Sequence, residues 1–247
     1  MGRELKALVQ ALVPLKDLVR AKTRLAGLLT PSERRALAQA MLEDVLAVLA
    51  AHPEVEGITL LSDDPAAYLF AAQFGATHWA ESELGCRGLN AVVAGASARL
   101  LGLRGQAVLL VHADLPQLSG ADVSAVLAAK RDGVGLVVGS DRHGSGTNLL
   151  CFDVAGMPEF CFGADSCARH LEAARRRGIT ACVLRRPGIG LDVDEPGDLA
   201  LLLQQPDLPA TGHTAVLLRG AGLGARIGLA LDSLNLHRDP LDREEVG

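Results

Sequence analysis

Three aspartates stand at positions from which they could share one metal ion. Asp114 follows the apolar run Ala107–Val111, so it would lie at the carboxyl end of a buried strand, where open α/β sheets bind ligands. Asp192 and Asp194 are two residues apart, and in an extended segment both side chains project to the same side. Carboxylates so close together repel each other unless a cation lies between them, and Mg²⁺ prefers hard oxygen ligands. We therefore expect Asp114, Asp192 and Asp194 to bind Mg²⁺.

Each aspartate also has a purely structural alternative. Asp114 could lie in a solvated loop before a helix. Asp194 could cap the helix that we expect to begin at Pro196, with Asp192 in solvent. Capping and metal binding by neighbouring groups do not exclude one another. We favour metal binding because the third carboxylate stands at another strand end.

A basic loop follows the first apolar run of the chain. Within nine residues it carries four cations, Lys16, Arg20, Lys22 and Arg24. Point charges and guanidinium groups of this kind are what a triphosphate requires. The loop is neither a Walker A motif nor a Gly-rich dinucleotide turn. The alternative interpretation is a solvated basic loop.

Two further segments are candidates for binding an anion. Residues 141–148, Asp-Arg-His-Gly-Ser-Gly-Thr-Asn, form a polar, Gly-rich loop that leads into an apolar run. Residues 162–166, Phe-Gly-Ala-Asp-Ser, open a predicted helix. Backbone amides at a helix start, together with a hydroxyl and a small glycine, suit a carboxylate or a phosphate. Ordinary capping by Asp165 or Ser166 is the alternative.

The elements that must position these residues alternate between strands and helices. This alternation is typical of a doubly wound, mostly parallel sheet, and therefore of an α/β fold. The expected strands are Ala7–Val13, Ile58–Ser62, Thr77–Trp79, Ala107–His112, Gly135–Gly139, Asn148–Asp153 and Ala181–Leu184. The expected helices begin with one at Thr30-Pro31-Ser32-Glu33, a capping box, and continue with Pro65–Phe74, Leu89–Leu101, Ala121–Lys130, Ser166–Arg177 and Pro196–Gln204.

The pattern changes after residue 205, so we predict one domain over residues 1–205 and an appended tail over residues 206–247. The segment Ala215–Leu236 is too apolar for a free linker, yet rich in glycine. We expect it to pack on its own domain or across a homodimer. Residues 237–247 are polar and are expected to fray.

Composition excludes several classes of protein. Aromatic residues make up 3% of the chain and the formal net charge is −5, which argues against a nucleic-acid surface. The five cysteines include no C-x-x-C pair, so they indicate neither a disulfide framework nor a zinc cluster. The chain lacks a signal-peptide pattern and an apolar run of membrane-spanning length, which favours a cytoplasmic protein without a membrane partner.

Several of these segments together resemble one family. Pro14-x-Lys16, Ala21-Lys22-x-Arg24-Leu25, Ala113-Asp114-Leu115-Pro116, Gly146-Thr147-Asn148, Phe162-Gly163-x-Asp165-Ser166 and Asp192-x-Asp194-x-Pro196 are similar to the motifs of the phospholactate guanylyltransferases. That family makes the guanylylated acid precursor of the deazaflavin coenzyme F-420. The resemblance covers roughly residues 7–204 and implies a Rossmann-like nucleotidyltransferase fold.

The resemblance also implies roles for individual residues. The three aspartates would hold the metal and, with Lys22, serve catalysis. The triphosphate and nucleotide would be bound by Pro14, Lys16, Lys22, Arg24 and Asn90, although Asn90 could instead cap a helix. Thr147, Gly163 and Ser166 would hold the acceptor acid. His112 departs from the small residue expected before Ala113. We interpret it as a strand-end histidine, with contact to the substrate as the alternative.

The implied reaction is in-line attack of a substrate phosphate oxygen on the α-phosphorus of GTP, with release of pyrophosphate. An ionised phosphate needs no general base, and positioning and charge neutralisation would carry catalysis. Arg142, His143, Ser145, Thr147 and Ser166 offer many hydrogen-bond donors, which favours 3-phospho-D-glycerate as the acceptor over 2-phospho-L-lactate or phosphoenolpyruvate.

Two other functions remain open at this point. One is another cofactor or sugar nucleotidyltransferase, which a competition assay between bases would reveal. The other is a non-catalytic nucleotide-binding homologue. The presence of all three aspartates speaks against the second, because a binder has little need of a metal site.

Overall fold

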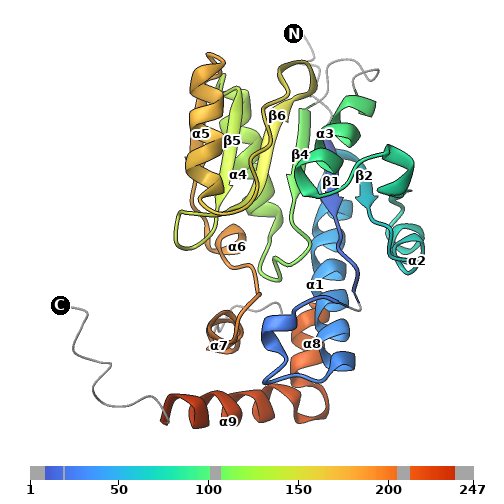
Figure 1. The fold of residues 1–247 in the computed structure, drawn as a ribbon, viewed down its shortest axis with the longest axis vertical. Coiled ribbons are helices and arrows are strands. Elements are labelled where there is room, and N and C mark those ends of the chain that lie inside the picture. The colour runs from blue at the N-terminus through green and yellow to red at the C-terminus, as the bar shows by residue number, and fades with distance from the viewer. Residues whose placement is uncertain (1–8, 19, 101–106, 205–211, 237–247) are drawn as a thin grey trace, which may run out of the picture.

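The apolar runs of the sequence form one mixed sheet in the computed structural model, which describes residues 9–18, 20–100, 107–204 and 212–236. Its strand order is β3-β2-β1-β4-β6-β5-β7. The strands are β1 (Val9–Pro14), β2 (Val55–Leu61), β3 (Thr77–Trp79), β4 (Ala107–Val111), β5 (Leu136–Ser140), β6 (Thr147–Asp153) and β7 (Ala181–Leu184). All neighbouring pairs are parallel except those of β6, which runs antiparallel to β4 and β5 (Figure 1).

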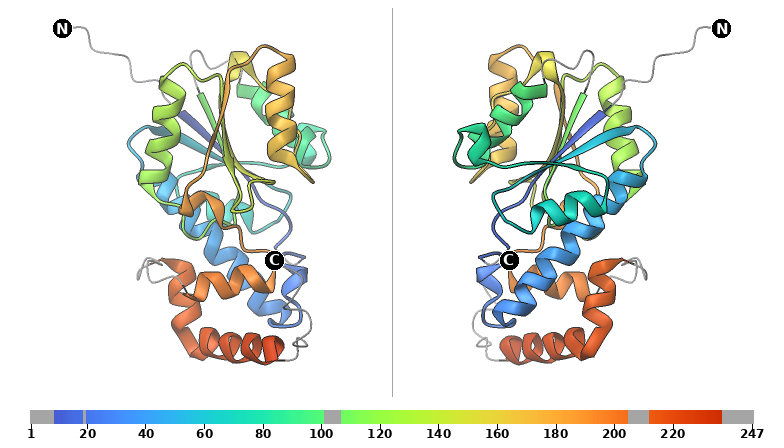
Figure 2. Two further views of the ribbon diagram at one scale, coloured as in Figure 1. Left: turned by 90° about the vertical axis from the view of Figure 1, so that its left-hand side faces the viewer. Right: turned by 90° about the vertical axis from the view of Figure 1, so that its right-hand side faces the viewer.

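Helices cover both faces of the sheet. Figure 2 shows α1 (Pro31–Ala51) and α4 (Gly120–Arg131) on one face, and α3 (Leu89–Arg99) and α5 (Ser166–Arg176) on the other. Each face has its own apolar cluster, with Leu42 and Val123 in the first and Val92 and Ala174 in the second. The short helix α2 (Ala67–Gln73) packs beside β2 and β3 at the sheet edge.

The predicted α/β, doubly wound, mostly parallel fold is confirmed. Helix α1 begins with the predicted capping box, in which Thr30 Oγ1 accepts from the Glu33 amide and the Glu33 carboxylate accepts from the Thr30 amide. The antiparallel direction of β6 was not predicted. It follows from the loop 141–146, which is too short for a parallel crossover of about a dozen residues.

The residues after β7 form a third apolar cluster below the carboxyl ends of the strands. These residues form α6 (Pro187–Gly190), α7 (Pro196–Gln204), α8 (His213–Arg219) and α9 (Leu223–Leu236), and the last three of these helices contribute to the cluster. Helix α8 contacts α1, and α9 contacts α7. Leu218, Ile227 and Leu231 are buried there with Leu25 and Met41 from the first part of the chain. The Asp44 carboxylate also accepts hydrogen bonds from the first backbone amides of α8.

The predicted tail therefore packs, over its described part, on the chain's own helices. The first residues of the expected strand Ala7–Val13, the end of the helix Leu89–Leu101, the start of the tail and the fraying end at 237–247 lie outside the described residues. Among the residues with described placement, no single helix meets the length and hydropathy of a membrane span. Only α8 and α9 taken together, bent by 73°, pass such a test.

Candidate active site

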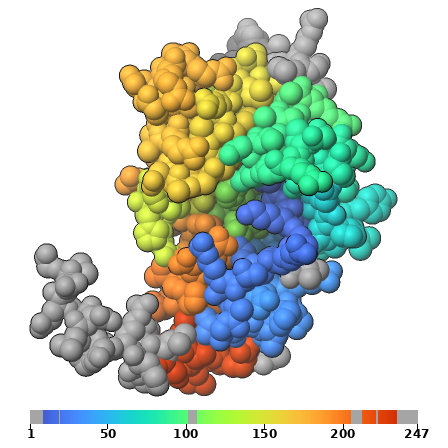
Figure 3. Space-filling model, in the orientation of Figure 1, coloured from blue at the N-terminus to red at the C-terminus, as the bar shows by residue number. Residues whose placement is uncertain are grey.

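A cavity of about 720 Å³ opens at the carboxyl ends of β1 and β4. Its wall combines the loop after β1, the residues after β4, the start of β6 and the start of α5. Figure 3 shows the hollow between the blue loop of the first residues and the green, yellow and orange segments around it. This is the sheet edge at which the sequence placed the ligand, and pairing of β1 with β4 brings the two strand ends together.

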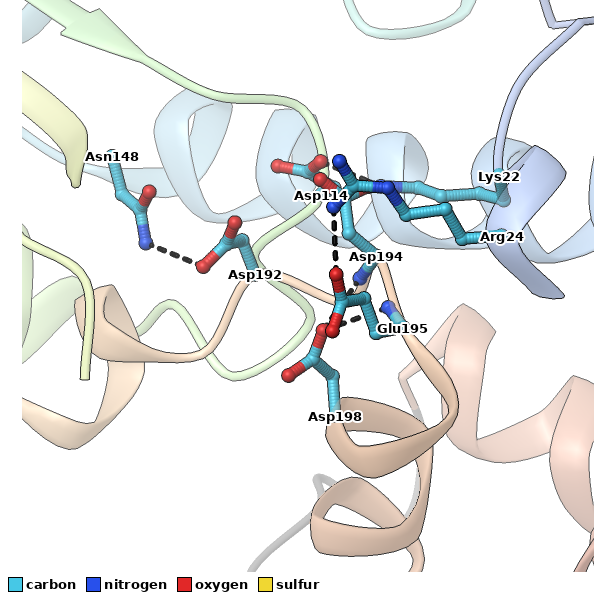
Figure 4. Close-up of polar contacts among 8 residues, drawn as sticks. All are labelled: Lys22, Arg24, Asp114, Asn148, Asp192, Asp194, Glu195 and Asp198. Atoms are coloured by element: carbon cyan, nitrogen blue, oxygen red, sulfur yellow. Dashed lines mark hydrogen bonds and ion pairs between the residues drawn. The ribbon is translucent and has the colours of Figure 1, made fainter. Parts of the chain in front are cut away.

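The floor of the cavity is an ion-pair cluster centred on Lys22. The ammonium of Lys22 lies 2.6 Å from Asp114 Oδ2 and 2.7 Å from Asp194 Oδ1 (Figure 4). The Lys22 side chain is only 7% exposed. Burial alone would lower the pKa of Lys22, but the two carboxylates outweigh it and raise the pKa above its usual value. Lys22 is therefore charged, and it neutralises two of the three predicted metal ligands.

The local backbone aims Lys22 inward. Lys22 has a left-handed conformation, with φ of 55° and ψ of 39°, which costs an L-residue other than glycine free energy. It precedes the short 3₁₀ helix η1 (Thr23–Leu25), whose Leu25 is fully buried in the third apolar cluster. The anchored Leu25 and the two ion pairs hold Lys22 in this conformation.

Asp192 points to the same cavity but has a different partner. Its Oδ1 accepts a hydrogen bond from Asn148 Nδ2 at 3.1 Å (Figure 4). Burial, together with the nearby charge of Asp114, raises the pKa of Asp192 above its usual value. Among the described residues, Asp192 thus lies near negative charges and has no ion pair with a cation.

The segment that carries Asp192 and Asp194 is fixed from the side of α7. The Asp198 carboxylate accepts from the backbone amides of Asp194 and Glu195, at 3.0 and 2.8 Å. The Arg142 guanidinium in turn pairs with Asp198. Asp198 therefore satisfies the two amides just before α7, and the Asp194 side chain points to Lys22 and the cavity.

The three aspartates suit a divalent cation in chemistry but are not yet gathered around one. Within the described ranges, no three side chains of His, Cys, Asp or Glu are arranged as a ready metal site. Lys22 supplies the positive charge between Asp114 and Asp194. The sequence had instead predicted one metal ion among three carboxylates. Asp114 Oδ1 is nevertheless buried without a hydrogen-bond partner. A buried carboxylate oxygen without a partner is costly, so it favours a further cation at this point.

The rest of the basic loop forms the rim of the cavity. Pro14, Lys16, Arg20 and Arg24 all line it. The nucleotide-binding roles of Pro14, Lys16 and Arg24 stay predictions. Arg24 pairs with Glu195 at 2.7 Å, but both side chains are more than half exposed. A surface ion pair of this kind contributes only about 0–1 kcal/mol, so Arg24 is free to turn to an incoming phosphate.

The opposite wall holds the residues expected to bind an acid. Gly146, Thr147, Gly163 and Ser166 line it. Gly163 has φ of 122°, which an L side chain rarely adopts, so that glycine is required there. At the start of α5, Asp165 makes no side-chain capping hydrogen bond. This argues against the ordinary-cap interpretation by Asp165 and leaves the helix start facing the cavity.

Three predicted residues lie apart from the cavity wall. His143 Nε2 accepts from Arg142 Nε at 2.9 Å in an exposed turn, and Ser145 hydrogen bonds to the Asp141 carboxylate. Neither residue lines the cavity. Asn90 exchanges two hydrogen bonds with the Phe162 backbone, at 2.7 and 3.2 Å, so it braces the wall behind Phe162 instead of facing the nucleotide side.

One histidine lines the cavity and a second lies behind its wall, and the sequence drew attention only to the first. His112 lines the cavity, packs against Phe162 at 5.3 Å between ring centroids, and has a buried Nε2 without a partner. Burial lowers its pKa. His170, on α5, is completely buried and hydrogen bonds to Thr147 Oγ1 at 3.1 Å. A polar residue on the inner face of a predicted amphipathic helix was the only signal for it.

Comparisons with known proteins point to one family of enzymes. A family model described as "Guanylyl transferase CofC like" matches residues 9–210. A phosphoenolpyruvate guanylyltransferase of Roseiflexus castenholzii is 40% identical over 205 residues, covering 83% of this chain and 90% of its own. One of Sphaerobacter thermophilus is 36% identical over 189 residues, covering 76% of this chain and 89% of its own.

Solved structures agree in fold. A putative nucleotide-diphospho-sugar transferase of Desulfovibrio desulfuricans superimposes with a TM-score of 0.76 at 20% identity, covering 91% of this chain and 98% of its own. A 4-diphosphocytidyl-2C-methyl-D-erythritol synthase superimposes with a TM-score of 0.51 at 17% identity, covering 80% of this chain and 97% of its own. The Rossmann-like fold predicted from the sequence is thus shared with these proteins.

Proposed function

Because the chain belongs to the CofC-like guanylyltransferase family, we propose that it transfers the guanylyl group of GTP to the phosphate of a small phosphorylated carboxylic acid. Pyrophosphate is the second product. The observation that carries the proposal is the Lys22 ammonium between Asp114 and Asp194 on the floor of the cavity. This cluster lies between the basic rim of the cavity and the wall that carries hydrogen-bond donors. A buried cation and two carboxylates at that position suit a reaction between two phosphate groups. We assign the reaction to coenzyme F-420 biosynthesis.

The nucleotide side is the loop after β1. Lys16 and Arg24 on the rim bind the triphosphate, and Lys22 neutralises charge nearest to the reacting phosphorus. Cations placed in advance in a partly closed cavity stabilise the charge that develops on the phosphoryl oxygens more strongly than water does. The pairing of Arg24 with Glu195 is exposed and is replaced when the triphosphate binds.

The metal that this site fits best is Mg²⁺. Asp114, Asp192 and Asp194 would hold it, since carboxylates are its preferred protein ligands and Asp114 Oδ1 has no partner in the structure. When bound, Mg²⁺ supplies charge neutralisation to the phosphates and polarises the phosphoryl group under attack. Asn148 keeps Asp192 oriented through its hydrogen bond, and Asp198 keeps the backbone of Asp194 in place.

The acceptor lies against the start of α5 and β6. Thr147, Gly163 and Ser166 bind its carboxylate, with the helix dipole of α5 in support. The acceptor phosphate then points to Lys22 and attacks in line with the departing pyrophosphate. An ionised phosphate oxygen is already a nucleophile, so no side chain has to remove a proton. Burial lowers the pKa of His112, so its imidazole binds a proton weakly, which suits a wall residue better than a general base.

We propose phosphoenolpyruvate as the preferred acceptor. The preference for 3-phospho-D-glycerate depended on a pocket rich in donors, and His143 and Ser145 are outside the cavity wall. The remaining donors, Thr147 and Ser166, suffice for one carboxylate. An extra hydroxyl would meet few partners there, and unpaired polar groups lose about 1–3 kcal/mol. The relatives described above are named for phosphoenolpyruvate.

A panel assay tests the proposal. GTP and Mg²⁺ are incubated with phosphoenolpyruvate, 2-phospho-L-lactate or 3-phospho-D-glycerate, and pyrophosphate and the guanylylated acid are measured. The same panel with ATP, CTP and UTP tests for another nucleotidyl transfer. Pyrophosphate release that depends on GTP and on one of the acids supports the function. Absence of product with all three acids contradicts it.

A further inference from the structure

His170 has a hydrogen-bonding arrangement that defines where its proton lies. Its Nε2 lies 2.9 Å from the backbone nitrogen of Cys161. A backbone N–H can only donate, so Nε2 must accept. A neutral imidazole carries its single proton on the other nitrogen, and the proton of His170 is therefore on Nδ1.

The neutral form is the one that this environment supports. Burial lowers the pKa of His170 to about 4, and the ring is completely buried. Phe162 packs edge-on against it, at 4.8 Å between ring centroids. A protonated imidazole would direct a second N–H at the Cys161 amide, which is unfavourable. One tautomer is thus selected by a backbone amide that does not depend on ligand binding.

The consequence falls on Thr147. His170 Nδ1 is 3.1 Å from Thr147 Oγ1, so the Nδ1–H donates and the hydroxyl oxygen accepts. The backbone of Ser166, one helical turn before His170, also hydrogen bonds to the ring. Because the Thr147 oxygen accepts from His170, the hydroxyl proton of Thr147 can donate to a ligand in the cavity that Thr147 lines.

We propose that His170 is a positioning residue that orients the Thr147 hydroxyl as a hydrogen-bond donor to the carboxylate of the acceptor acid. The proposal rests on the proposed function, since that function places the acceptor carboxylate against Thr147. It assigns a role to a residue that lies behind the cavity wall and touches no substrate. Because the Thr147 hydroxyl is oriented to donate, it binds an anionic oxygen better than a group that can only donate a hydrogen bond.

Two substitutions separate the two nitrogens of the ring. His170→Asn places an amide near the position of Nδ1, where it can still donate to Thr147. His170→Gln places an amide near the position of Nε2, where it keeps the Cys161 partner and leaves Thr147 without its donor. We expect His170→Gln to raise the KM for the acceptor about tenfold. The KM for GTP and kcat should stay within about twofold. His170→Asn should keep an acceptor KM close to that of the wild type. Equal effects of the two substitutions would overturn the proposal, because they would indicate packing alone.

A double-variant cycle is the second test. Thr147→Val removes the hydroxyl and should raise the acceptor KM about tenfold. If His170 acts through that hydroxyl, His170→Gln added to Thr147→Val has no further effect on this KM. If the wild-type protein is active and the two substitutions raise the acceptor KM additively, the inference is refuted and the proposed function stands. A wild-type protein that turns over none of the three acids would refute the proposed function and the inference with it.

A measurement on the unaltered protein does not depend on folding of variants. Nitrogen-15 NMR of histidine-labelled protein at pH 7 distinguishes a protonated from an unprotonated ring nitrogen. The expected result is a proton on Nδ1 and none on Nε2 of His170. A proton on Nε2 would overturn the proposal.

Discussion

The ammonium of Lys22 lies 2.7 Å from a carboxylate oxygen of Asp194, a residue 172 positions later in the chain. The same ammonium pairs with Asp114, so one buried cation joins the loop after β1, the end of β4 and the segment before α7. Three parts of the sequence that are far apart thus meet at one charge. Lys22 occupies the place between two carboxylates that a divalent cation would compete for.

Replacing Lys22 should therefore affect metal and nucleotide in opposite directions. In Lys22→Met the carboxylates of Asp114 and Asp194 lose their cation, and we expect free Mn²⁺, used as a paramagnetic probe for Mg²⁺, to bind about tenfold more tightly. GTP should bind at least about tenfold more weakly, because the same cation serves the triphosphate. Electron paramagnetic resonance gives the first affinity and calorimetry the second.

A matched control is Lys130→Met, which removes a cation paired with Asp153 away from the cavity. Both affinities should stay within about twofold of the wild type in that variant. If Lys22→Met leaves free Mn²⁺ affinity unchanged, Lys22 and the metal do not share the two carboxylates.

The three aspartates should be essential for turnover. Asp114→Asn, Asp192→Asn and Asp194→Asn each remove one charge from the proposed Mg²⁺ ligands. We expect losses of kcat of at least about a hundredfold at saturating Mg²⁺, with unchanged far-ultraviolet circular dichroism. Asp153→Asn, at the exposed end of β6, is the control and should keep near wild-type turnover. Near wild-type rates in two of the three variants would contradict the metal assignment.

The acceptor preference can be tested by comparing kcat/KM for the three acids. We expect phosphoenolpyruvate to exceed 3-phospho-D-glycerate by about tenfold or more. His143→Ala should leave the order unchanged, since His143 pairs with Arg142 in an exposed turn. If 3-phospho-D-glycerate gives the higher kcat/KM, and His143→Ala reverses the order, His143 belongs to the acceptor site and the preference for phosphoenolpyruvate is wrong.

The sequence predicted those site residues that combine a chemical type with a strand end. Lys22 and Asp114 line one cavity because β1 and β4, the strands before them, are parallel neighbours. Asp192 and Asp194 line the same cavity because the segment after β7, which contains α6, returns from the sheet edge to these strand ends. Local pattern and the carboxyl-end rule suffice for such residues. What the sequence could not show is the ion pairing of Lys22, since Lys22 and Asp194 meet only through the tertiary fold.

For three other residues the sequence predicted the wrong surroundings, namely His143, Ser145 and Asn90. Each has donors of the right type beside a correctly predicted motif, yet their partners are Arg142, Asp141 and the Phe162 backbone. The direction of a side chain in a turn depends on contacts that residue spacing does not encode. His170 was missed for a related reason, because it is a buried helix residue that does not line the cavity and meets Thr147 only in the tertiary fold.

The tail should contribute to the stability of the domain. Deleting residues 206–247 would expose Leu25 and Met41, which are buried against the third apolar cluster. We expect a clear decrease in melting temperature and increased binding of an apolar dye. Asp44→Ala, which removes the carboxylate at the start of α8, should cost about 0.5–2 kcal/mol. A truncated protein that melts like the full chain would show that α8 and α9 are dispensable for the core.

His170 also predicts how stability depends on pH. Its pKa falls from the usual 6.5 to about 4 in the folded protein, chiefly through burial. As the pH falls through 6.5, the unfolded chain takes up a proton that the folded chain refuses, so the stabilisation present above 6.5 is lost towards pH 4. Between pH 7 and pH 5 this group alone should lower the free energy of unfolding by about 2 kcal/mol.

His170→Asn isolates that contribution because asparagine does not titrate. Urea unfolding of wild type and variant at pH 7 and pH 5 gives the two decreases, and we expect the wild-type decrease to be larger by about 2 kcal/mol. The absolute stability of the variant does not matter, since each protein is compared with itself. Between pH 8 and pH 7 the two proteins should change equally, because His170 is neutral in the folded protein and almost neutral in the unfolded one over that interval. Equal decreases between pH 7 and pH 5 would mean that the folded protein accepts a proton on His170, and the ring nitrogen beside Cys161 would then have to donate where it is required to accept.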